Sequence, residues 1–97
     1  MKNIMEIGKV LEHHKAHLSD RFKVKEIGVF GSYARGQQKE GSDIDILVEF
    51  SEPVGFFTFL DLEEYLAGVL DLKVDLVSKK ALKPRIGKHI LHDLVSV

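Results

Sequence analysis

The sequence predicts an α/β domain, α+β in stricter terms, with a small mixed β-sheet of about three strands flanked by helices. Three observations predict this class. Apolar residues recur at helical spacing in three segments, short segments rich in β-branched residues lie between them, and a strand, a helix and a strand follow one another. With 97 residues, the chain is expected to form a single domain over residues 1–97.

The N-terminal half is expected to contain a helix, a strand and a loop. Residues 4–18 form an amphipathic helix whose apolar stripe consists of Ile4, Ile7, Leu11 and Leu18, with His14 beside them. Residues 23–30 are rich in β-branched side chains and end at Gly31, which predicts a strand followed by a short helical turn. Residues 36–41 are polar and flanked by glycines, which predicts a surface loop.

Residues 43–50 alternate strictly, as a strand with two different faces does. One face would carry Ile44, Ile46, Val48 and Phe50, and the other Asp43, Asp45, Leu47 and Glu49. A helix at 56–70 is expected to bury Phe56, Leu60, Leu66 and Leu70. A strand at 73–78 and a last helix beginning near Pro84, which carries Ile86, Ile90, Leu91 and Leu94, complete the chain.

The connections between strands predict their directions. The segment between the second and third strands is long enough for a helical crossover, so these strands should run parallel. The segment between the first and second strands is short, which favours an antiparallel pair.

Composition excludes several classes of protein. The formal net charge of −1 gives no basic footprint for a nucleic-acid polymer, and there are no cysteines for disulfides or thiolate-bound zinc. No apolar run approaches the roughly 20 residues of a membrane span. We therefore expect a cytoplasmic protein without a membrane partner.

The first candidate site feature is Gly31-Ser32 at the end of the first strand. Ser32 is expected to cap a short helix, so that its hydroxyl and nearby backbone N–H groups form an anion site. Arg35 and Lys39 could add positive charge there, although exposed surface positions explain them equally well. Alone, a Gly-Ser pair at a strand end is more often ordinary turn chemistry.

The second and third features are carboxylates. Asp43 and Asp45 are two positions apart on a strand, so both side chains point to one face, about 6.5 Å apart at Cα. Asp75 joins that face if the second and third strands are parallel neighbours. Clustered carboxylates raise one another's pKa, and a bound divalent cation resolves that conflict. The alternative is that Asp43 and Asp45 only face solvent and that Asp75 is a polar residue near a strand end.

Together these features resemble a known family. The pattern of Gly31-Ser32, ten further residues and then Asp43-Ile44-Asp45, with Asp75 on the third strand, resembles the DNA polymerase β-like nucleotidyltransferases. Among these, the chain is most similar to the minimal nucleotidyltransferases, the MntA-like antitoxins of prokaryotes.

The resemblance implies an activity and a set of site residues. Asp43, Asp45 and Asp75 would be both catalytic and metal-binding, with two Mg²⁺ ions, or Mn²⁺, as cofactors. Gly31, Ser32 and Arg35 would bind the nucleotide, with ATP as the substrate. The chain would transfer AMP to a tyrosine hydroxyl of a HEPN-family toxin and form a homo- or hetero-oligomer.

Two other functions remain open at this point. The chain could neutralise its partner by forming a complex, with nucleotide binding incidental, or it could be the catalytic subunit of a small-molecule nucleotidyltransferase. The aromatic residues Phe56, Phe57, Phe59 and Tyr65 exceed what one helix face buries, and the surplus could form a contact surface.

Overall fold

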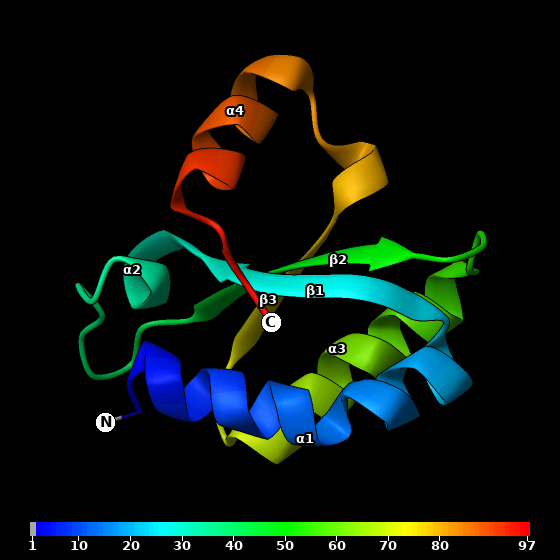
Figure 1. Cartoon of the computed structure of the whole chain (residues 1–97), viewed down its shortest axis with the longest axis horizontal. Coiled ribbons are helices and arrows are strands. Elements are labelled where there is room, and N and C mark those ends of the chain that lie inside the picture. Colours follow the sequence, from blue (N-terminus) through cyan, green and yellow to red (C-terminus); the bar gives the residue numbers. More distant parts are fainter. Residues whose placement is uncertain (1) are drawn as a thin grey trace.

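The computed structural model describes residues 2–97, arranged as a sheet between helices (Figure 1). Its elements in chain order are α1 (Ile4–Phe22), β1 (Val24–Phe30), α2 (Gly31–Ala34), β2 (Ile44–Phe50), α3 (Phe56–Leu70), β3 (Val74–Ser78), the short 3₁₀ helix η1 (Lys79–Ala81), α4 (Pro84–Asp93) and β4 (Val95–Ser96). The predicted helices and strands are all present, with bounds that differ by a few residues.

The sheet has four strands in the order β3-β2-β1-β4. β1 pairs antiparallel with β2, and β2 pairs parallel with β3, so both predicted directions are confirmed. The mixed sheet and its flanking helices confirm the predicted fold class.

The fourth strand was not predicted. β4 contains only Val95 and Ser96, which is too short for any alternation to be recognised. It pairs antiparallel with β1 beside Gly28. A Cβ atom on Gly28 would collide with the Leu94 side chain, so the glycine gives the C-terminal segment room to reach the sheet. Leu94, expected on the last helix, is instead in extended backbone.

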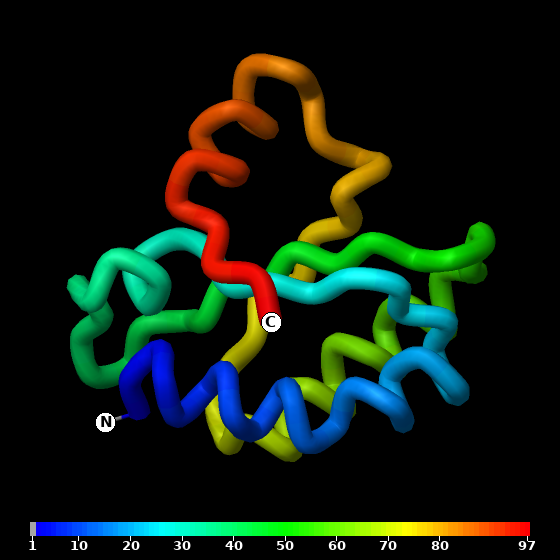
Figure 2. Tube along the Cα trace, in the orientation of Figure 1, coloured from blue at the N-terminus to red at the C-terminus, as the bar shows by residue number. Residues whose placement is uncertain are grey.

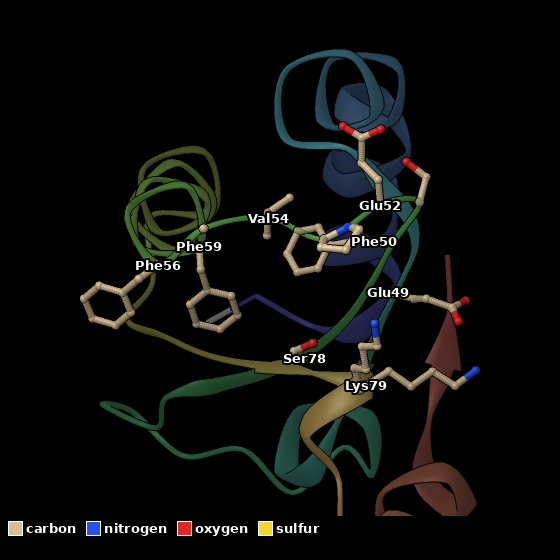
Figure 3. Close-up of a pocket in the computed structure, with 12 residues that line it drawn as sticks. Glu49, Phe50, Glu52, Val54, Phe56, Phe59, Ser78 and Lys79 are labelled. Carbon is tan, nitrogen blue, oxygen red and sulfur yellow. The ribbon is translucent and has the colours of Figure 1, made fainter.

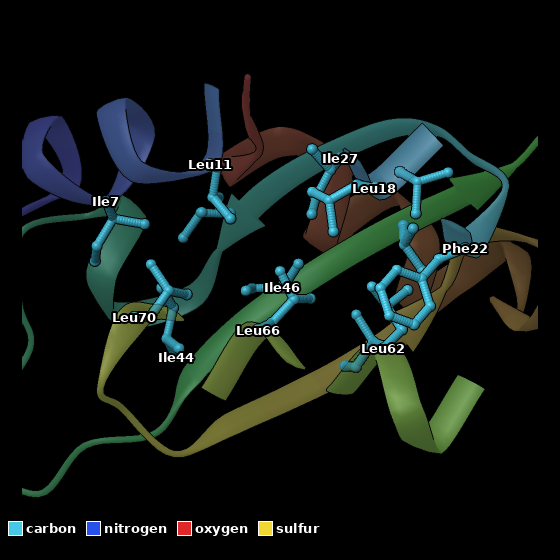
Figure 4. Close-up of a cluster of buried hydrophobic side chains, with 14 of the residues drawn as sticks. Ile7, Leu11, Leu18, Phe22, Ile27, Ile44, Ile46, Leu62, Leu66 and Leu70 are labelled. Carbon is cyan, nitrogen blue, oxygen red and sulfur yellow. The ribbon is translucent and has the colours of Figure 1, made fainter. Parts of the chain in front are cut away.

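The hydrophobic core lies between the sheet and helices α1 and α3 (Figure 4). Ile7, Leu11 and Leu18 of α1 are fully buried, which confirms most of the stripe predicted for the first helix. Ile44 and Ile46 of β2 meet them from the sheet and are also fully buried. One face of the sheet is therefore closed to solvent by apolar packing.

The buried face of α3 agrees with the prediction only in part. Leu66 and Leu70 are fully buried as predicted, and so is Leu62, whereas Phe56 is 70% exposed and Leu60 is 40% exposed. Buried residues four apart stay on one side of a helix, but a residue two positions away points to nearly the opposite side. Leu60 precedes Leu62 by two positions, so both cannot face the core.

Helix α4 stands apart from the core, on the face of the sheet opposite α1 and α3, as the ribbon and the Cα tube both show (Figures 1 and 2). Gly87 is its only buried residue. Within residues 2–97, no helix combines the length and the apolar character that crossing a membrane requires.

Candidate active site

The register of the sheet places the predicted site residues on neighbouring strands. Asp45 lies opposite Phe30, the last residue of β1, and beside Asp75 in the parallel pair of β2 and β3. Adjacent strands are about 4.8 Å apart, so the end of β1, Asp45 and Asp75 share one end of the sheet. The expectation that Asp75 joins Asp45 on neighbouring parallel strands is confirmed.

Alternation along β2 determines where Asp45 points. Its neighbours Ile44 and Ile46 are fully buried against α1 and α3. Successive side chains of a strand point to opposite faces, so the Asp45 carboxylate lies on the other, more open face. The same apolar packing that fixes the strand also fixes the direction of the carboxylate.

The electrostatics of Asp45 reflect these neighbours. Burial raises the pKa of the Asp45 carboxyl above its ordinary value of 3.8, and the charges of Asp75 and Asp43 raise it further. A side-chain hydrogen bond with Asp75 also raises this pKa, while the Arg35 guanidinium opposes the shift. A cation placed beside Asp45 would offset the repulsion that contributes to this shift.

Asp43 completes the acidic cluster from outside the strand. It is exposed and immediately precedes β2, so its side chain is less constrained than that of Asp45. Across residues 2–97, no three His, Cys, Asp or Glu side chains stand in an arrangement ready to hold a metal ion. The chemistry of the donor set nevertheless fits Mg²⁺, which prefers carboxylate oxygens and leaves coordination positions to water and phosphate.

Gly31 connects the end of β1 to this cluster. Its φ of +73° lies in the left-handed region, and a Cβ atom there would collide with the Asp45 carboxylate. Only glycine satisfies both conditions at little cost. The sequence pointed to Gly31 as a phosphate-site residue but gave no sign of this contact with Asp45.

Ser32 does not cap a helix, contrary to our expectation. It is the second residue of α2, whose N-cap position is occupied by Phe30, and no side chain caps this helix. The reason is that the helical backbone already begins at Gly31, one residue earlier than a Ser32 cap requires. Among residues 2–97, no protein group forms a hydrogen bond with the half-buried Ser32 hydroxyl, which leaves it available to a ligand.

Arg35 is held by the last helix. Its Nη1 lies 2.8 Å from Oδ2 of Asp93, and its Nε donates a hydrogen bond of 3.1 Å to Oε1 of Gln37. The Arg35 charge has the smallest of the effects on the pKa of the Asp45 carboxyl, and it lowers that pKa. Asp93 is 58 positions away in the chain, so no local pattern could have indicated this pair.

The loop before Asp43 is tied to α2. The backbone N–H of Gln37 donates to the Ser32 carbonyl at 2.8 Å, and the hydroxyl of buried Tyr33 donates to the Ser42 carbonyl at 3.5 Å. Ser42 also accepts a hydrogen bond at Oγ from the Lys39 backbone. These contacts link the segment that carries Ser32 to the residue directly before Asp43.

An aromatic groove lies at the other ends of β2 and β3 (Figure 3). Its volume is about 570 Å³, and Phe50, Phe56 and Phe59 provide much of its apolar lining. None of the predicted site residues lines it. The exposed Phe56 and Phe57 thus lie away from the carboxylates.

Comparisons with known proteins agree with this geometry. The family model of the nucleotidyltransferase domain matches residues 11–97. The chain is 52% identical to the protein adenylyltransferase MntA of Thermococcus cleftensis, over 100% of this chain and 98% of that protein. Among solved structures, the chain resembles one described as a minimal nucleotidyltransferase, with 32% identity and a TM-score of 0.77. The match covers 99% of this chain and 100% of that one. It also resembles a chain from a crystal structure of a toxin–antitoxin with AMP-PNP, with 27% identity, a TM-score of 0.74 and coverage of 93% and 70%.

Proposed function

The chain belongs to the nucleotidyltransferase domain family, as a minimal nucleotidyltransferase of the MntA protein adenylyltransferase type, and we propose that it transfers AMP from ATP to a hydroxyl group of a HEPN-family toxin. The family resemblance stated from the motif is confirmed. The observation that carries the proposal is the pairing of Asp45 with Asp75, directly beside Gly31 and Ser32 at the end of β1.

The proposed reaction is an in-line displacement at the α-phosphorus of ATP. The acceptor hydroxyl oxygen forms a bond to this phosphorus, the bond from phosphorus to the β-phosphate bridging oxygen breaks, and pyrophosphate leaves. Asp75 is on the edge strand of the sheet, where an acceptor from another chain has access, and its carboxylate would take the hydroxyl proton. The product is an AMP ester of the acceptor.

The nucleotide phosphates would lie over α2. The free Ser32 hydroxyl can donate a hydrogen bond to a distal phosphate, and the Arg35 guanidinium can pair with the triphosphate charge. Gly31 brings this segment against Asp45, so phosphate ligands and carboxylates meet at one place. The similar chain found in a structure with AMP-PNP, an ATP analogue, supports a triphosphate ligand.

The three aspartates would hold divalent cations. Asp45 and Asp43 would be the main ligands and Asp75 a further one. Bound Mg²⁺ supplies charge that neutralises the phosphates and stabilises the attacking and leaving oxygens. The position of Asp45 beside Asp75 on the neighbouring strand supports this assignment, because a cation would offset the repulsion between the two carboxylates.

The acceptor is proposed to come from a partner protein. The similar chain in a toxin–antitoxin structure and the adenylyltransferase relative both support a toxin as that partner. The family resemblance indicates a tyrosine of a HEPN-family protein as the acceptor.

The test is a transfer assay with purified proteins. The chain is mixed with ATP, Mg²⁺ and the HEPN-family protein encoded beside its gene, and the intact mass of that protein is measured. We expect a gain of one or more AMP groups that disappears with EDTA or with a non-hydrolysable α,β-linked ATP analogue. A partner that is neutralised in a complex without gaining AMP would instead support the non-catalytic antitoxin.

A further inference from the structure

Helix α4 carries apolar side chains that the fold leaves uncovered. Ile86 is 55% exposed and Leu91 is 48% exposed, although the helix is strongly amphipathic and buries Gly87. Isolated exposed apolar residues are common. Ile86 and Leu91 are five positions apart, about 140° around the helix, so they offer a partner two separate apolar contacts on a helix that contributes little to the core.

The start of this helix and the residue that caps it are basic. Lys83, Arg85 and Lys88 are all exposed, and no acidic residue occurs between Lys79 and His92. Within residues 2–97, none of these three cations forms an ion pair. The first acidic residue after them, Asp93, already pairs with Arg35 at 2.8 Å. A chain with a net charge of −1 thus concentrates unpaired positive charge at the N-terminal end of α4, from its N-cap Lys83 to Lys88.

The position of α4 relates this surface to the site. α4 lies on the face of the sheet opposite the core, the face to which Asp45 points (Figure 1). The Asp93–Arg35 ion pair connects the end of α4 to the segment that would hold the nucleotide. A protein bound along α4 therefore lies on the side of the sheet where an acceptor hydroxyl must arrive.

From these observations we infer that α4 is the docking surface for the acceptor protein, and that it recognises an acidic surface of that protein containing apolar side chains. This inference rests on the proposed function, since it locates the partner of the same site. We call Lys83, Arg85, Ile86, Lys88 and Leu91 the α4 surface. Charge complementarity selects an acidic partner and accelerates its association, while Ile86 and Leu91 provide apolar contact.

Two alternatives fit the observations less well. A nucleic acid would use the cations but gain little from Ile86 and Leu91, and α4 contains no Phe, Tyr or Trp, its only rings being the imidazoles of His89 and His92. The exposed Phe56 and Phe57 form another apolar surface, but they lie near the opposite end of β2 and β3 from Asp45 and Asp75. A partner bound there would not bring its hydroxyl to the carboxylates.

The test compares two charge reversals of equal size. One variant carries Lys83→Glu and Lys88→Glu, and its control carries Lys15→Glu and Lys25→Glu, at exposed positions on α1 and β1. The KM for the HEPN-family protein in AMP transfer should rise at least about tenfold in the α4 variant and stay near the wild-type value in the control. The KM for ATP should not change in either. Raised salt should increase the wild-type KM for the partner more than that of the α4 variant.

The apolar component is tested separately. Ile86→Ser should raise the KM for the partner, whereas Phe57→Ser at the distal end should not. Both side chains are largely exposed, so neither change should unfold the chain.

Several outcomes would overturn the inference. The first is a KM for the partner protein that does not change in the Lys83→Glu, Lys88→Glu variant. The second is a larger effect of Phe57→Ser than of Ile86→Ser on that KM. The third is a single-stranded RNA that binds wild type and not the α4 variant while the KM for the partner protein is unchanged.

Binding of the partner protein is also measured directly with the Asp45→Asn variant, because binding does not depend on AMP transfer. If that binding requires the α4 surface but wild type transfers no AMP, the proposed reaction fails and the docking site stands. If no complex forms, the docking site fails.

Discussion

Strand β2 presents different side chains on its two faces, and the two environments differ most around Asp45. On one face, Ile44, Ile46 and Val48 are fully buried beneath α1 and α3. On the other, Asp45 stands beside Asp75 and in contact range of Gly31, with a raised pKa. Successive side chains of a strand point to opposite faces, so neighbouring residues of β2 contribute to the hydrophobic core and to the candidate active site. Adjacent substitutions in β2 should therefore have different consequences.

The largest expected effect is on the core face. Ile46→Ala should lower the free energy of unfolding by about 2–5 kcal/mol, because it leaves a cavity among fully buried side chains. Urea unfolding of this variant and of Asp45→Asn gives the comparison. Asp45→Asn should be as stable as wild type or more stable without metal, since it removes repulsion with Asp43 and Asp75. Equal destabilisation by both changes would contradict the division between the faces.

A second prediction concerns the contact between Gly31 and Asp45. Gly31→Ala and Gly36→Ala both introduce a side chain at a positive φ, of +73° and +69°, at a cost of about 1–2 kcal/mol. A Cβ at Gly36 meets nothing within 4 Å, whereas one at Gly31 meets the Asp45 carboxylate. Unfolding experiments should show Gly31→Ala to be the more destabilising, and it alone should reduce AMP transfer. If the two variants are equally stable and equally active in AMP transfer, Gly31 has no role beyond its backbone conformation.

A third prediction concerns Ser32. Ser32→Ala should weaken binding of ATP by about 1 kcal/mol, the usual contribution of one hydrogen bond, without loss of stability. Ser51→Ala, at the other end of β2, is the matched control and should not change ATP binding. Calorimetry with ATP and with AMP provides the measurement. An equal loss for both nucleotides would contradict the assignment of Ser32 to the distal phosphates.

The smallest expected effect is on the pH dependence of stability. The pKa of Asp45 is raised above 3.8 in the folded state, so the folded protein binds its proton more tightly than the unfolded chain does. Stability without metal should therefore fall as the pH rises from about 4 through this raised pKa. Thermal melts should show a weaker fall in Asp45→Asn than in wild type. If thermal stability falls equally with pH in both proteins, a group other than Asp45 causes the fall.

The features predicted correctly depend on local patterns. The alternation in residues 43–50 and the helical crossover were sufficient to place Asp45 beside Asp75. Three features could not be predicted because they depend on distant contacts. The Arg35–Asp93 pair spans 58 positions, β4 pairs with β1 beside Gly28, which leaves room for Leu94, and Gly31 meets Asp45 across two strands. The wrong assignment of Phe56 and Leu60 to the buried face of α3 arose from helix phase, which shifts by 100° per residue. The expected Ser32 cap was wrong because α2 begins one residue earlier, at Gly31.

The central claim is that the carboxylate face performs AMP transfer while the core face only maintains the fold. The most direct measurement is the intact mass of the HEPN-family partner after incubation with ATP, Mg²⁺ and either wild type or Asp45→Asn. We expect the rate of AMP addition to fall at least about a hundredfold in the variant, because the lost charge weakens metal stabilisation of the transition state. Partner binding and thermal stability should be retained. AMP addition at the wild-type rate by a folded Asp45→Asn protein would contradict the claim.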